Sequence, residues 1–264
     1  MKQDGQFILF ESKEELKNWL FAQNVKRTIK TIDNHHTAVP AYSNFTGSNH
    51  FTLQKSMQRY HVKDNGWKDI AQHFTTFPDG TVMTGRSLEM KSAGIINRGS
   101  DSICIENLGN FDKDIMTEKQ KEIIVFLNAI LCVHFKLTPS RSTILYHRWF
   151  RQSDGKYDPI STGKEYKSCP GTKFFGGNTV EAAEKNFIPL IKAEMEAINM
   201  RFKDLEVNGK RHWAANDIEE AADMGLVFGM KQADGSYIFN PDANITRAEM
   251  VAILMRYIRS QKNK

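Results

Sequence analysis

Residues 27–35, RTIKTIDNH, are rich in β-branched side chains and end at a pair of neighbouring histidines, His35 and His36. Isoleucine and threonine fit the pleated surface of a sheet, so this stretch predicts a β-strand. A histidine at the end of a strand can project into a cleft above the sheet. We therefore expect this strand to belong to the central sheet and to carry residues of a site.

Strands and helices alternate around this strand as far as residue 199. β-Branched or apolar runs next to turn residues predict further strands, and capping boxes or apolar residues at helical spacing predict helices. The predicted strands are residues 72–77, 81–83, 102–108 and 142–146. Two predicted helices begin after the capping boxes at Ser12 and Thr117, and two more cover residues 52–61 and 179–199. This alternation predicts an α/β domain with a mixed central sheet flanked by helices on both faces.

The pattern changes after residue 201. Residues 212–224 form an amphipathic stretch that stops at Gly225, and Thr246-Arg247-Ala248-Glu249 is a capping box that opens a last helix. Two helices of this size predict a small, mostly α-helical module. We therefore expect a larger domain over residues 1–200 and a small second domain over residues 201–264.

The composition limits the class of protein. The 264 residues are 40% apolar and 25% charged, which excludes global disorder; at about 150 residues per domain they fit one medium domain with a small appendage. A net charge of +5 is below that of a typical nucleic-acid-binding protein, so no nucleic acid is expected as a partner. No apolar run approaches the ~20 residues that cross a bilayer, and the first residues lack a secretory pattern. We expect no membrane insertion and no signal peptide.

Three separated positions hold residue types that bind metals: the pair His35-His36, His147 and Cys169. His147 follows a predicted strand and Cys169 lies in a Pro-Gly turn, so these side chains could meet above the sheet. Two histidines and a cysteine are zinc ligands, and three protein ligands leave the fourth position of the ion for water, as in catalytic sites. The alternative is that scattered histidines and one cysteine occur by chance.

Six short motifs follow one another in the order found in type-2 N-acetylmuramoyl-L-alanine amidases. They are Ile32-Asp-Asn-His-His-Thr37, Gly66-Trp-Lys-Asp-Ile70 with His73-Phe74, Asp79-Gly80-Thr81 with Gly85-Arg86, Ser102-Ile-Cys-Ile-Glu106 with Gly109-Asn110-Phe111, Tyr146-His147-Arg148, and Ser168-Cys169-Pro170-Gly171. The chain therefore resembles this family, which includes phage lysozyme-type amidases and peptidoglycan recognition proteins. The resemblance implies a zinc amidase catalytic domain over residues 1–200. Its reaction would be hydrolysis of the amide bond between N-acetylmuramic acid and L-alanine of peptidoglycan.

The resemblance also assigns the ligands of a Zn2+ ion. It implies that His35, His147 and Cys169 coordinate the metal, with Cys169 as the thiolate. It also implies that His36 does not bind the metal, which agrees with the opposite orientation of neighbouring side chains in a strand. One imidazole of the histidine pair is therefore expected at the site.

Amide hydrolysis also requires a base for the attacking water and a donor for the developing oxyanion. The resemblance implies that Glu106 is the acid/base and that Lys167 stabilises the tetrahedral intermediate. The alternatives are an ordinary edge-strand carboxylate and a solvated lysine. Many relatives have a tyrosine just before the His-Phe of the hairpin strand, whereas this chain has Gln72, whose amide cannot take a proton at neutral pH. Ser92 likewise stands where some relatives have a histidine.

The C-terminal part resembles one S-layer homology domain. The motifs that carry this resemblance are Phe202-Lys-Asp204, His212-Trp213-Ala214, Phe239-Asn-Pro241 and Ile245-Thr-Arg-Ala-Glu249. The resemblance implies that residues 201–264 bind a secondary cell-wall polysaccharide, which is often anionic. Arg247 could pair with its carboxylates and Trp213 could stack on a sugar. The alternative is that Trp213 lies in the core and Arg247 caps a surface helix.

Two other functions fit parts of this pattern. A noncatalytic peptidoglycan-binding receptor on the same fold would not need all three ligands, and a wall glycosidase would use paired carboxylates without a metal. The expected substrate lies outside the membrane, yet the chain has no recognisable export signal. We therefore expect a protein made in the cytoplasm and released on lysis to act at the bacterial cell wall. Such a protein is a phage or prophage endolysin; an autolysin exported by another route is the alternative.

Overall fold

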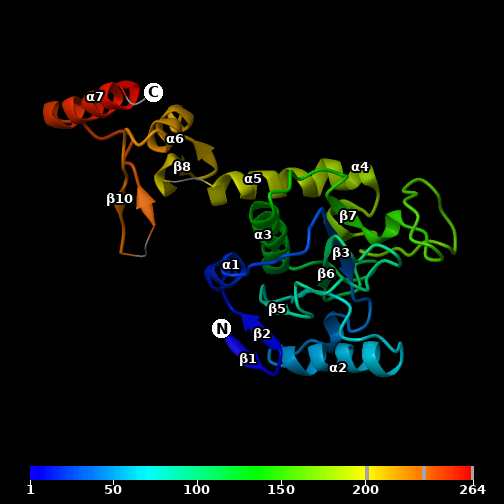
Figure 1. The fold of residues 1–264 in the computed structure, drawn as a ribbon. Helices are drawn as coiled ribbons and strands as arrows, with labels where there is room; N and C mark the ends of the chain where they lie inside the picture. Colours follow the sequence, from blue (N-terminus) through cyan, green and yellow to red (C-terminus); the bar gives the residue numbers. More distant parts are fainter. Residues whose placement is uncertain (200–201, 234–235, 263–264) are drawn as a thin grey trace. The chain divides into compact units, whose positions relative to one another are not determined.

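The computed structural model describes residues 1–199, 202–233 and 236–262. These residues form two compact units, Met1–Met195 and Glu196–Lys264 (Figure 1). Within the described ranges, no helix combines the length and the apolar character needed to cross a bilayer.

The first unit is built on a seven-stranded sheet with the strand order β1-β2-β5-β4-β6-β3-β7. The strands are β1 (Lys2–Asp4), β2 (Phe7–Phe10), β3 (Thr31–His36), β4 (Phe74–Thr76), β5 (Val82–Thr84), β6 (Ser102–Asn107) and β7 (Ile144–Tyr146). β4, β6, β3 and β7 run parallel, whereas β5, β2 and β1 pair in antiparallel fashion at one edge. The expected mixed central sheet is confirmed.

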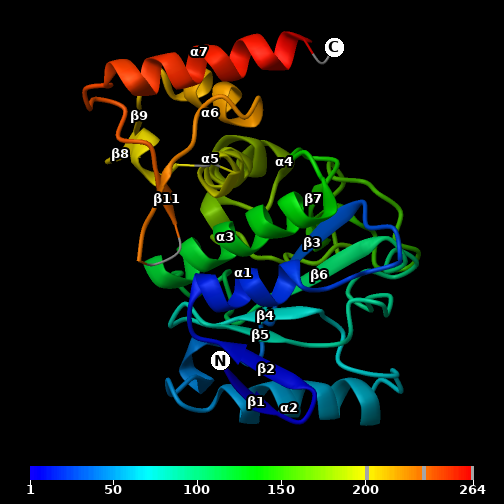
Figure 2. The ribbon, with the colours of Figure 1, turned by 60° about the vertical axis from the view of Figure 1, so that its left-hand side comes forward.

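Two helices cover one face of this sheet and contact each other, α1 (Lys13–Phe21) and α3 (Glu118–Phe135) (Figure 2). A buried amide pair joins α3 to β3. Asn34 Nδ2 donates to Asn128 Oδ1 at 3.0 Å, and Asn128 Nδ2 donates to Asn34 Oδ1 at 3.2 Å. Because both side chains are fully buried, these bonds replace the hydrogen bonds to water that the amides lose on folding. The pair therefore fixes α3 over the strand that carries His35.

The helix α2 (His50–Lys63) covers the opposite face of the sheet (Figures 1 and 2). Its Met57 packs in a buried apolar cluster with side chains of β2, β5 and neighbouring loops: Phe7, Leu9, Ile70, Phe77, Met83 and Leu108. Helices therefore lie on both faces, as expected, and every residue of β3 is buried.

The N-cap residues of the predicted capping boxes mark the starts of α1 and α3. Ser12 Oγ accepts a hydrogen bond from Glu15 N–H at 3.2 Å, and Thr117 Oγ1 accepts one from Gln120 N–H at 3.1 Å. Each bond satisfies a backbone donor of the first helical turn that has no partner within the helix. These local bonds define where α1 and α3 begin.

Other elements differ from the prediction. β3 begins only at Thr31, and the guanidinium of Arg27, before the strand, bonds to carbonyl groups near the start of β6. Residues 179–199 are not one regular helix, since a π-helical turn (Ala183–Phe187) separates α4 (Val180–Ala182) from α5 (Ile188–Asn199). β1 and β2 were not predicted, because runs of three and four residues carry too little periodicity.

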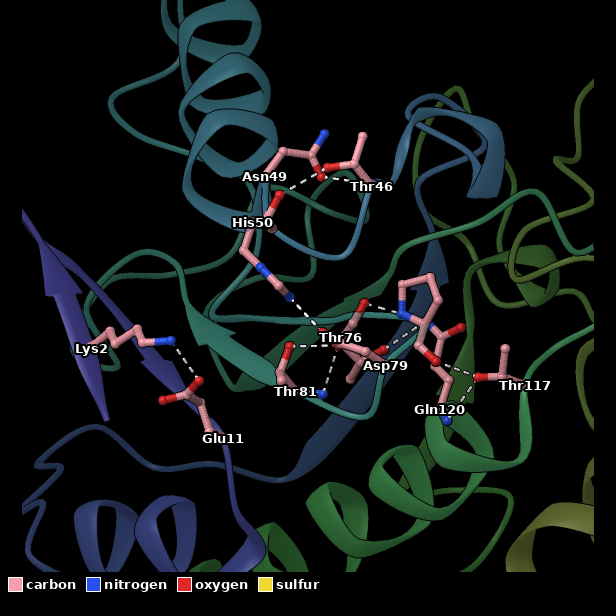
Figure 3. Close-up of polar contacts among 12 residues, drawn as sticks. Lys2, Glu11, Thr46, Asn49, His50, Thr76, Asp79, Thr81, Thr117 and Gln120 are labelled. Carbon is pink, nitrogen blue, oxygen red and sulfur yellow. Dashed lines mark hydrogen bonds and ion pairs between the residues drawn. The ribbon is translucent and has the colours of Figure 1, made fainter.

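Polar contacts tie β4 and the turn that follows it to both neighbouring helices (Figure 3). His50 Nε2, at the start of α2, lies 2.8 Å from Asp79 Oδ2, and Thr81 Oγ1 donates to Asp79 Oδ1 at 2.8 Å. At the start of α3, Gln120 Nε2 donates to Thr76 O at 3.3 Å. These contacts hold β4 in place beside β6.

The described residues of the second unit include two α-helices and two small β-ribbons. They are α6 (Ala215–Asp223), α7 (Arg247–Lys262), β8 (Glu206–Val207) with β9 (Lys210–Arg211), and β10 (Met230–Lys231) with β11 (Tyr237–Ile238). Its core comprises Phe202, Leu205, Ala215, Ala222 and Val227. Thr246 N–H donates to Glu249 Oε2 at 2.8 Å and Glu249 N–H donates to Thr246 Oγ1 at 3.2 Å, which is the predicted capping box. The mostly α-helical character of the C-terminal part is confirmed.

Candidate metal centre and catalytic cleft

The register between β3 and β6 places His35 opposite Glu106 and His36 opposite Asn107. Residues that pair across neighbouring strands point to the same face of a sheet, and successive residues point to opposite faces. His35 and Glu106 therefore project together, with His35 Nδ1 3.8 Å from Glu106 Oε1. His36 points to the other face, where its Nδ1 accepts a hydrogen bond from Phe111 N–H at 3.1 Å. Only His35 of the pair joins the candidate metal ligands, although His36 also contributes to the lining of the cleft.

Two further segments bring His147 and Cys169 to His35. His147 directly follows β7, which pairs with β3, and its ring centroid lies 4.6 Å from that of His35. Cys169 lies in a turn, where the amide of His36 donates to its Sγ at 3.3 Å. The candidate ligand atoms of His35, His147 and Cys169 lie within 4.8 Å of one another, and all three residues are buried. The structure thus assembles a group that could hold a metal ion.

The two imidazoles are suited to coordination. Burial lowers the pKa of His35 well below its usual value, and nearby His147 and Lys167 add to this effect. Burial, with help from Lys167, lowers the pKa of His147 to about 3. Both rings are therefore neutral at physiological pH and offer a lone pair, as metal-binding histidines do. With the sulfur of Cys169 they form the nitrogen and sulfur donor set that zinc prefers.

Cys169 holds its proton when no cation is near. Burial raises the pKa of its thiol well above the usual value, and Glu106 adds to the rise. The hydrogen bond from His36 N–H and the charge of Lys167 act in the opposite direction. Since only the thiolate coordinates, metal binding at this site is coupled to release of the Cys169 proton.

Glu106 and Lys167 line the same cleft as the three candidate ligands. Burial raises the pKa of Glu106 to about 8, and Lys167 opposes the rise. Glu106 Oε2 is buried, and no described residue forms a hydrogen bond with it. β6 is an inner strand, so Glu106 is not the edge-strand carboxylate of the alternative interpretation. A buried carboxyl group with an unsatisfied oxygen at a cleft can exchange a proton with a bound molecule.

The cleft has a volume of about 1200 Å³, far more than a metal ion requires. Its lining beyond the candidate metal centre is largely apolar and aromatic, and includes Val39, Pro40, Met57, Tyr60 and Trp67. Trp67 is supported by His61, which stacks on it with ring centroids 4.9 Å apart. Apolar walls with a few polar groups at the floor are typical of sites that bind organic substrates.

Gln72 and Ser92, the two positions where the resemblance led us to look for a tyrosine and a histidine, are not among the described residues that line the cleft. Gln72 is fully buried, and its Nε2 donates to Thr75 Oγ1 at 2.9 Å. Ser92 is buried, with its Oγ 3.2 Å from Ser102 Oγ. Neither side chain supplies an acid or a base, so Glu106 is the titratable carboxyl group next to the candidate ligands.

Two residues beside His35 were not predicted. Gly94 lines the cleft next to the His35 ring, and Asn107 Nδ2 donates to His35 O at 2.7 Å. The sequence offers a weak signal for Gly94, its place directly after Ser92-Ala93, and none for Asn107 beyond its position at the end of a predicted strand. Both contacts depend on how distant segments pack.

In the second unit, Trp213 is 87% exposed, so the interpretation that it lies in the core is wrong. Arg247 is the first residue of α7 and is exposed. The capping bonds of that helix come from Thr246 and Glu249, which removes the proposed capping role of Arg247. Both side chains are accessible to a polymer.

The sequence matches models of two known families. A family model for N-acetylmuramoyl-L-alanine amidases matches residues 25–172, more than half of the chain, and a model for S-layer homology domains matches residues 209–251. Peptidoglycan-recognition protein SC2 of Drosophila simulans is 37% identical over 86 residues, which cover 33% of this chain and 46% of that protein. The N-acetylmuramoyl-L-alanine amidase of Homo sapiens is 33% identical over 141 residues, which cover 53% of this chain and 22% of the relative. The chain thus spans less than half of the length of these relatives.

Two solved structures are also similar to this chain. Wild-type Drosophila PGRP-LB superimposes with a TM-score of 0.48 and 20% identity, over 62% of this chain and 84% of that one. The endolysin N-acetylmuramoyl-L-alanine amidase LysCS from Clostridium intestinale superimposes with a TM-score of 0.43 and 22% identity, over 60% of this chain and 84% of that one.

Proposed function

Because the chain belongs to the N-acetylmuramoyl-L-alanine amidase family, we propose that it is a zinc-dependent enzyme that acts on peptidoglycan. The bond hydrolysed is the amide between N-acetylmuramic acid and the L-alanine of the stem peptide. One observation carries this proposal: His35, His147 and Cys169 converge beside Glu106 at the floor of a large cleft.

Zinc would be held by His35, His147 and Cys169. When bound, it would act as a Lewis acid on the scissile carbonyl and lower the pKa of an attacking water. The chain's own residues orient the substrate and handle the proton. The apolar cleft walls bind the sugar and peptide on either side of the amide, and thereby hold the carbonyl over the floor of the cleft.

Glu106 is the proposed acid/base. Its carboxylate lies 3.8 Å from His35 Nδ1, which supports this role because an attacking water at the candidate metal centre would be within its reach. In its ionised form, which Lys167 favours, Glu106 can take a proton from the water; the protonated form, which burial favours, can then return that proton to the departing alanine nitrogen. Lys167, which lines the cleft with a positive charge, stabilises the oxyanion of the tetrahedral intermediate.

The second unit is proposed to bind the wall. Residues 1–200 would form the catalytic domain and residues 201–264 a wall-binding domain whose ligand is an anionic secondary cell-wall polysaccharide. Trp213 offers an exposed aromatic face for a sugar, and Arg247 offers a guanidinium for a carboxylate. This pairing of domains suits an endolysin, made in the cytoplasm and released on lysis, or an autolysin that acts on the wall from outside.

The reaction is tested by mass spectrometry of purified peptidoglycan digested with wild-type protein and with Glu106→Gln. We expect wild type to release free stem peptides, with new amino groups at alanine and no new reducing ends, and a chelator to abolish the release. Glu106→Gln should release almost none while it retains zinc. Glu165→Gln, an exposed glutamate near the Cys169 turn, serves as the matched control with full activity.

Each other outcome points to a different function. Reducing ends released in the presence of chelator would identify a glycosidase. Binding of peptidoglycan by metal-free protein without any cleavage would identify a noncatalytic receptor. Either result would contradict the proposed amidase.

A further inference from the structure

The turn that carries Cys169 packs against the segment 109–114. Gly171, with φ +108°, lies directly on the backbone of Phe111, because a Cβ atom at position 171 would be 2.6 Å from Phe111 C. Lys173 N–H donates to Phe111 O at 2.8 Å just after the turn. The turn and this segment, distant in sequence, are therefore packed as one piece.

Asp112 bonds to both ends of this turn. Its Oδ2 accepts a hydrogen bond from the hydroxyl group of Ser168, and its Oδ1 accepts one from Thr172 N–H at 2.8 Å. Ser168 directly precedes Cys169 and Thr172 directly follows Gly171, so a single carboxylate spans the Cys-Pro-Gly segment. The Ser168 carbonyl is fixed as well, since it accepts a bond from Asn178 Nδ2 at 2.7 Å.

The segment around Asp112 is itself well braced. Asn110 Oδ1 accepts a hydrogen bond from Asp112 N–H at 3.2 Å. Asp114 Oδ2 in turn accepts bonds from Asn110 N–H at 2.7 Å and from Tyr42 N–H at 3.3 Å. The Asp112 carboxylate is therefore presented in a fixed orientation, unlike a freely rotating surface side chain.

The cleft lining, within the part of the chain that the structure describes, includes Ser168 and Cys169 but not Asp112. Asp112 therefore does not itself line the cleft, and it acts on the site through the turn that it bonds and through its charge, which adds to the rise in the pKa of Cys169. Metal ligands depend on such supporting hydrogen bonds for their position. We propose that Asp112 is a positioning residue, which fixes the turn so that Cys169 Sγ is held beside His35 and His147 and thereby sets the zinc affinity of the site. This inference rests on the zinc-dependent function proposed above.

The test compares the zinc affinity of full-length Asp112→Ala, Asp112→Asn and Ser168→Ala with that of the wild type. Affinity is measured by competition with a chromogenic chelator. Co2+-substituted protein adds a direct readout, because the near-ultraviolet charge-transfer band from thiolate to Co2+ reports the bond to Cys169. Glu118→Gln, a carboxylate-to-amide change at an exposed residue of α3, is the matched control.

We expect Asp112→Ala to lower zinc affinity about 10- to 100-fold, as supporting residues of metal sites do, and to weaken the Co2+ band. Asp112→Asn keeps an oxygen that can accept from Thr172 N–H, so its loss should be smaller, as should that of Ser168→Ala. The double variant Asp112→Ala/Ser168→Ala should be no weaker than Asp112→Ala, because the serine acts through the same carboxylate. Glu118→Gln should match the wild type.

Wild-type zinc affinity together with an unchanged Co2+ band in Asp112→Ala would overturn the inference. If circular dichroism shows that Asp112→Ala does not fold, Asp112→Asn and Ser168→Ala provide the test instead. Wild-type zinc affinity in both of these variants would then overturn the inference. Failure of the proposed function has a different signature. A wild-type protein that binds zinc in an Asp112-dependent way but releases no stem peptides would refute the amidase and leave the role of Asp112 intact.

Discussion

Gly94 lies directly against the imidazole of His35: a Cβ atom at position 94 would be 2.8 Å from His35 Nε2 and 2.7 Å from Cys104 Sγ. Both distances are shorter than a side-chain carbon tolerates. His35 has little room to retreat, because it is buried in β3 between β6 and β7. The position of the first candidate ligand therefore depends on the absence of a side chain on a separate loop.

We expect Gly94→Ala to displace the His35 ring and to reduce zinc content and activity together. A misplacement of about 1 Å in a catalytic group costs on the order of 100-fold in rate, which sets the expected loss of stem-peptide release. Zinc per chain, measured by elemental analysis after dialysis, reports the site independently of activity. Gly5→Ala is the control, since Gly5 has φ +62° but open space around it. That change should cost about 1–2 kcal/mol of backbone strain and leave the zinc content unchanged. Full zinc and full activity in Gly94→Ala would refute this dependence.

Replacement of Lys167 should separate catalysis from metal binding. If its charge stabilises the oxyanion, Lys167→Ala should lose roughly 100- to 1000-fold in kcat, the typical cost of one oxyanion donor, with little change in KM. Lys167→Arg should retain part of the rate because it keeps the positive charge. Lys164→Ala, at an exposed lysine of the same loop, should behave as wild type. Steady-state kinetics on a muropeptide substrate measure kcat and KM separately. A variant with a raised KM and an unchanged kcat would assign Lys167 to substrate binding instead.

The raised pKa of Glu106 predicts a pH-dependent stability of the metal-free protein. Burial raises this pKa from 4.5 to about 8 in the folded chain, so the folded state favours the protonated carboxyl group. The resulting stability is complete below about pH 4.5 and is lost as the pH rises through about 8. The amide of Glu106→Gln cannot ionise, so the variant should become more stable than the wild type as the pH rises.

Thermal unfolding in the presence of chelator, followed by circular dichroism from pH 5 to pH 8.5, measures this difference. The midpoint of Glu106→Gln relative to wild type should increase across this range. A constant difference would show that Glu106 titrates normally in the folded protein.

The exposed residues of the second unit should govern binding to cell walls. Loss of one aromatic face in Trp213→Ala should weaken cosedimentation with purified walls roughly 2- to 10-fold, as expected for about 0.5–1.5 kcal/mol. Arg247→Ala should weaken it most at low salt, since ionic attraction is screened as salt increases. Val207→Ala and Arg259→Ala, both at exposed positions of the same unit, are the apolar and charged controls. Walls stripped of secondary polysaccharide should abolish the difference between Trp213→Ala and wild type, and equal binding of all variants to intact walls would contradict the assignment.

Several elements of the fold were predictable because the interactions that specify them are local. The N-cap bonds at Ser12, Thr117 and Thr246 join residues three apart, so their pattern is visible in the chain itself. The types of the candidate ligands were also readable, since zinc accepts few kinds of side chain. The alternation of neighbouring side chains in a strand separated the orientation of His35 from that of His36.

Other features depend on contacts between distant segments. The register that sets His35 beside Glu106 is decided by which faces of β3 and β6 become buried, and no local pattern encodes it. The contact of Gly94 with His35 and the bonds of Asp112 to the Cys169 turn each join separate loops. Exposure of Trp213, which the sequence left open between core and surface, likewise depends on how the second unit packs.

The order of amino acids was therefore enough to predict the helix starts, the class of fold and the chemistry of the candidate ligands, because short-range hydrogen bonds and side-chain type are properties of the chain. Only the packed molecule decided the register that sets Glu106 beside His35, which glycine makes room for that histidine and which aspartate bonds to the turn that carries Cys169. Burial, strand register and hydrogen bonds between loops arise only when segments far apart in the chain come together, so no short stretch of sequence encodes them.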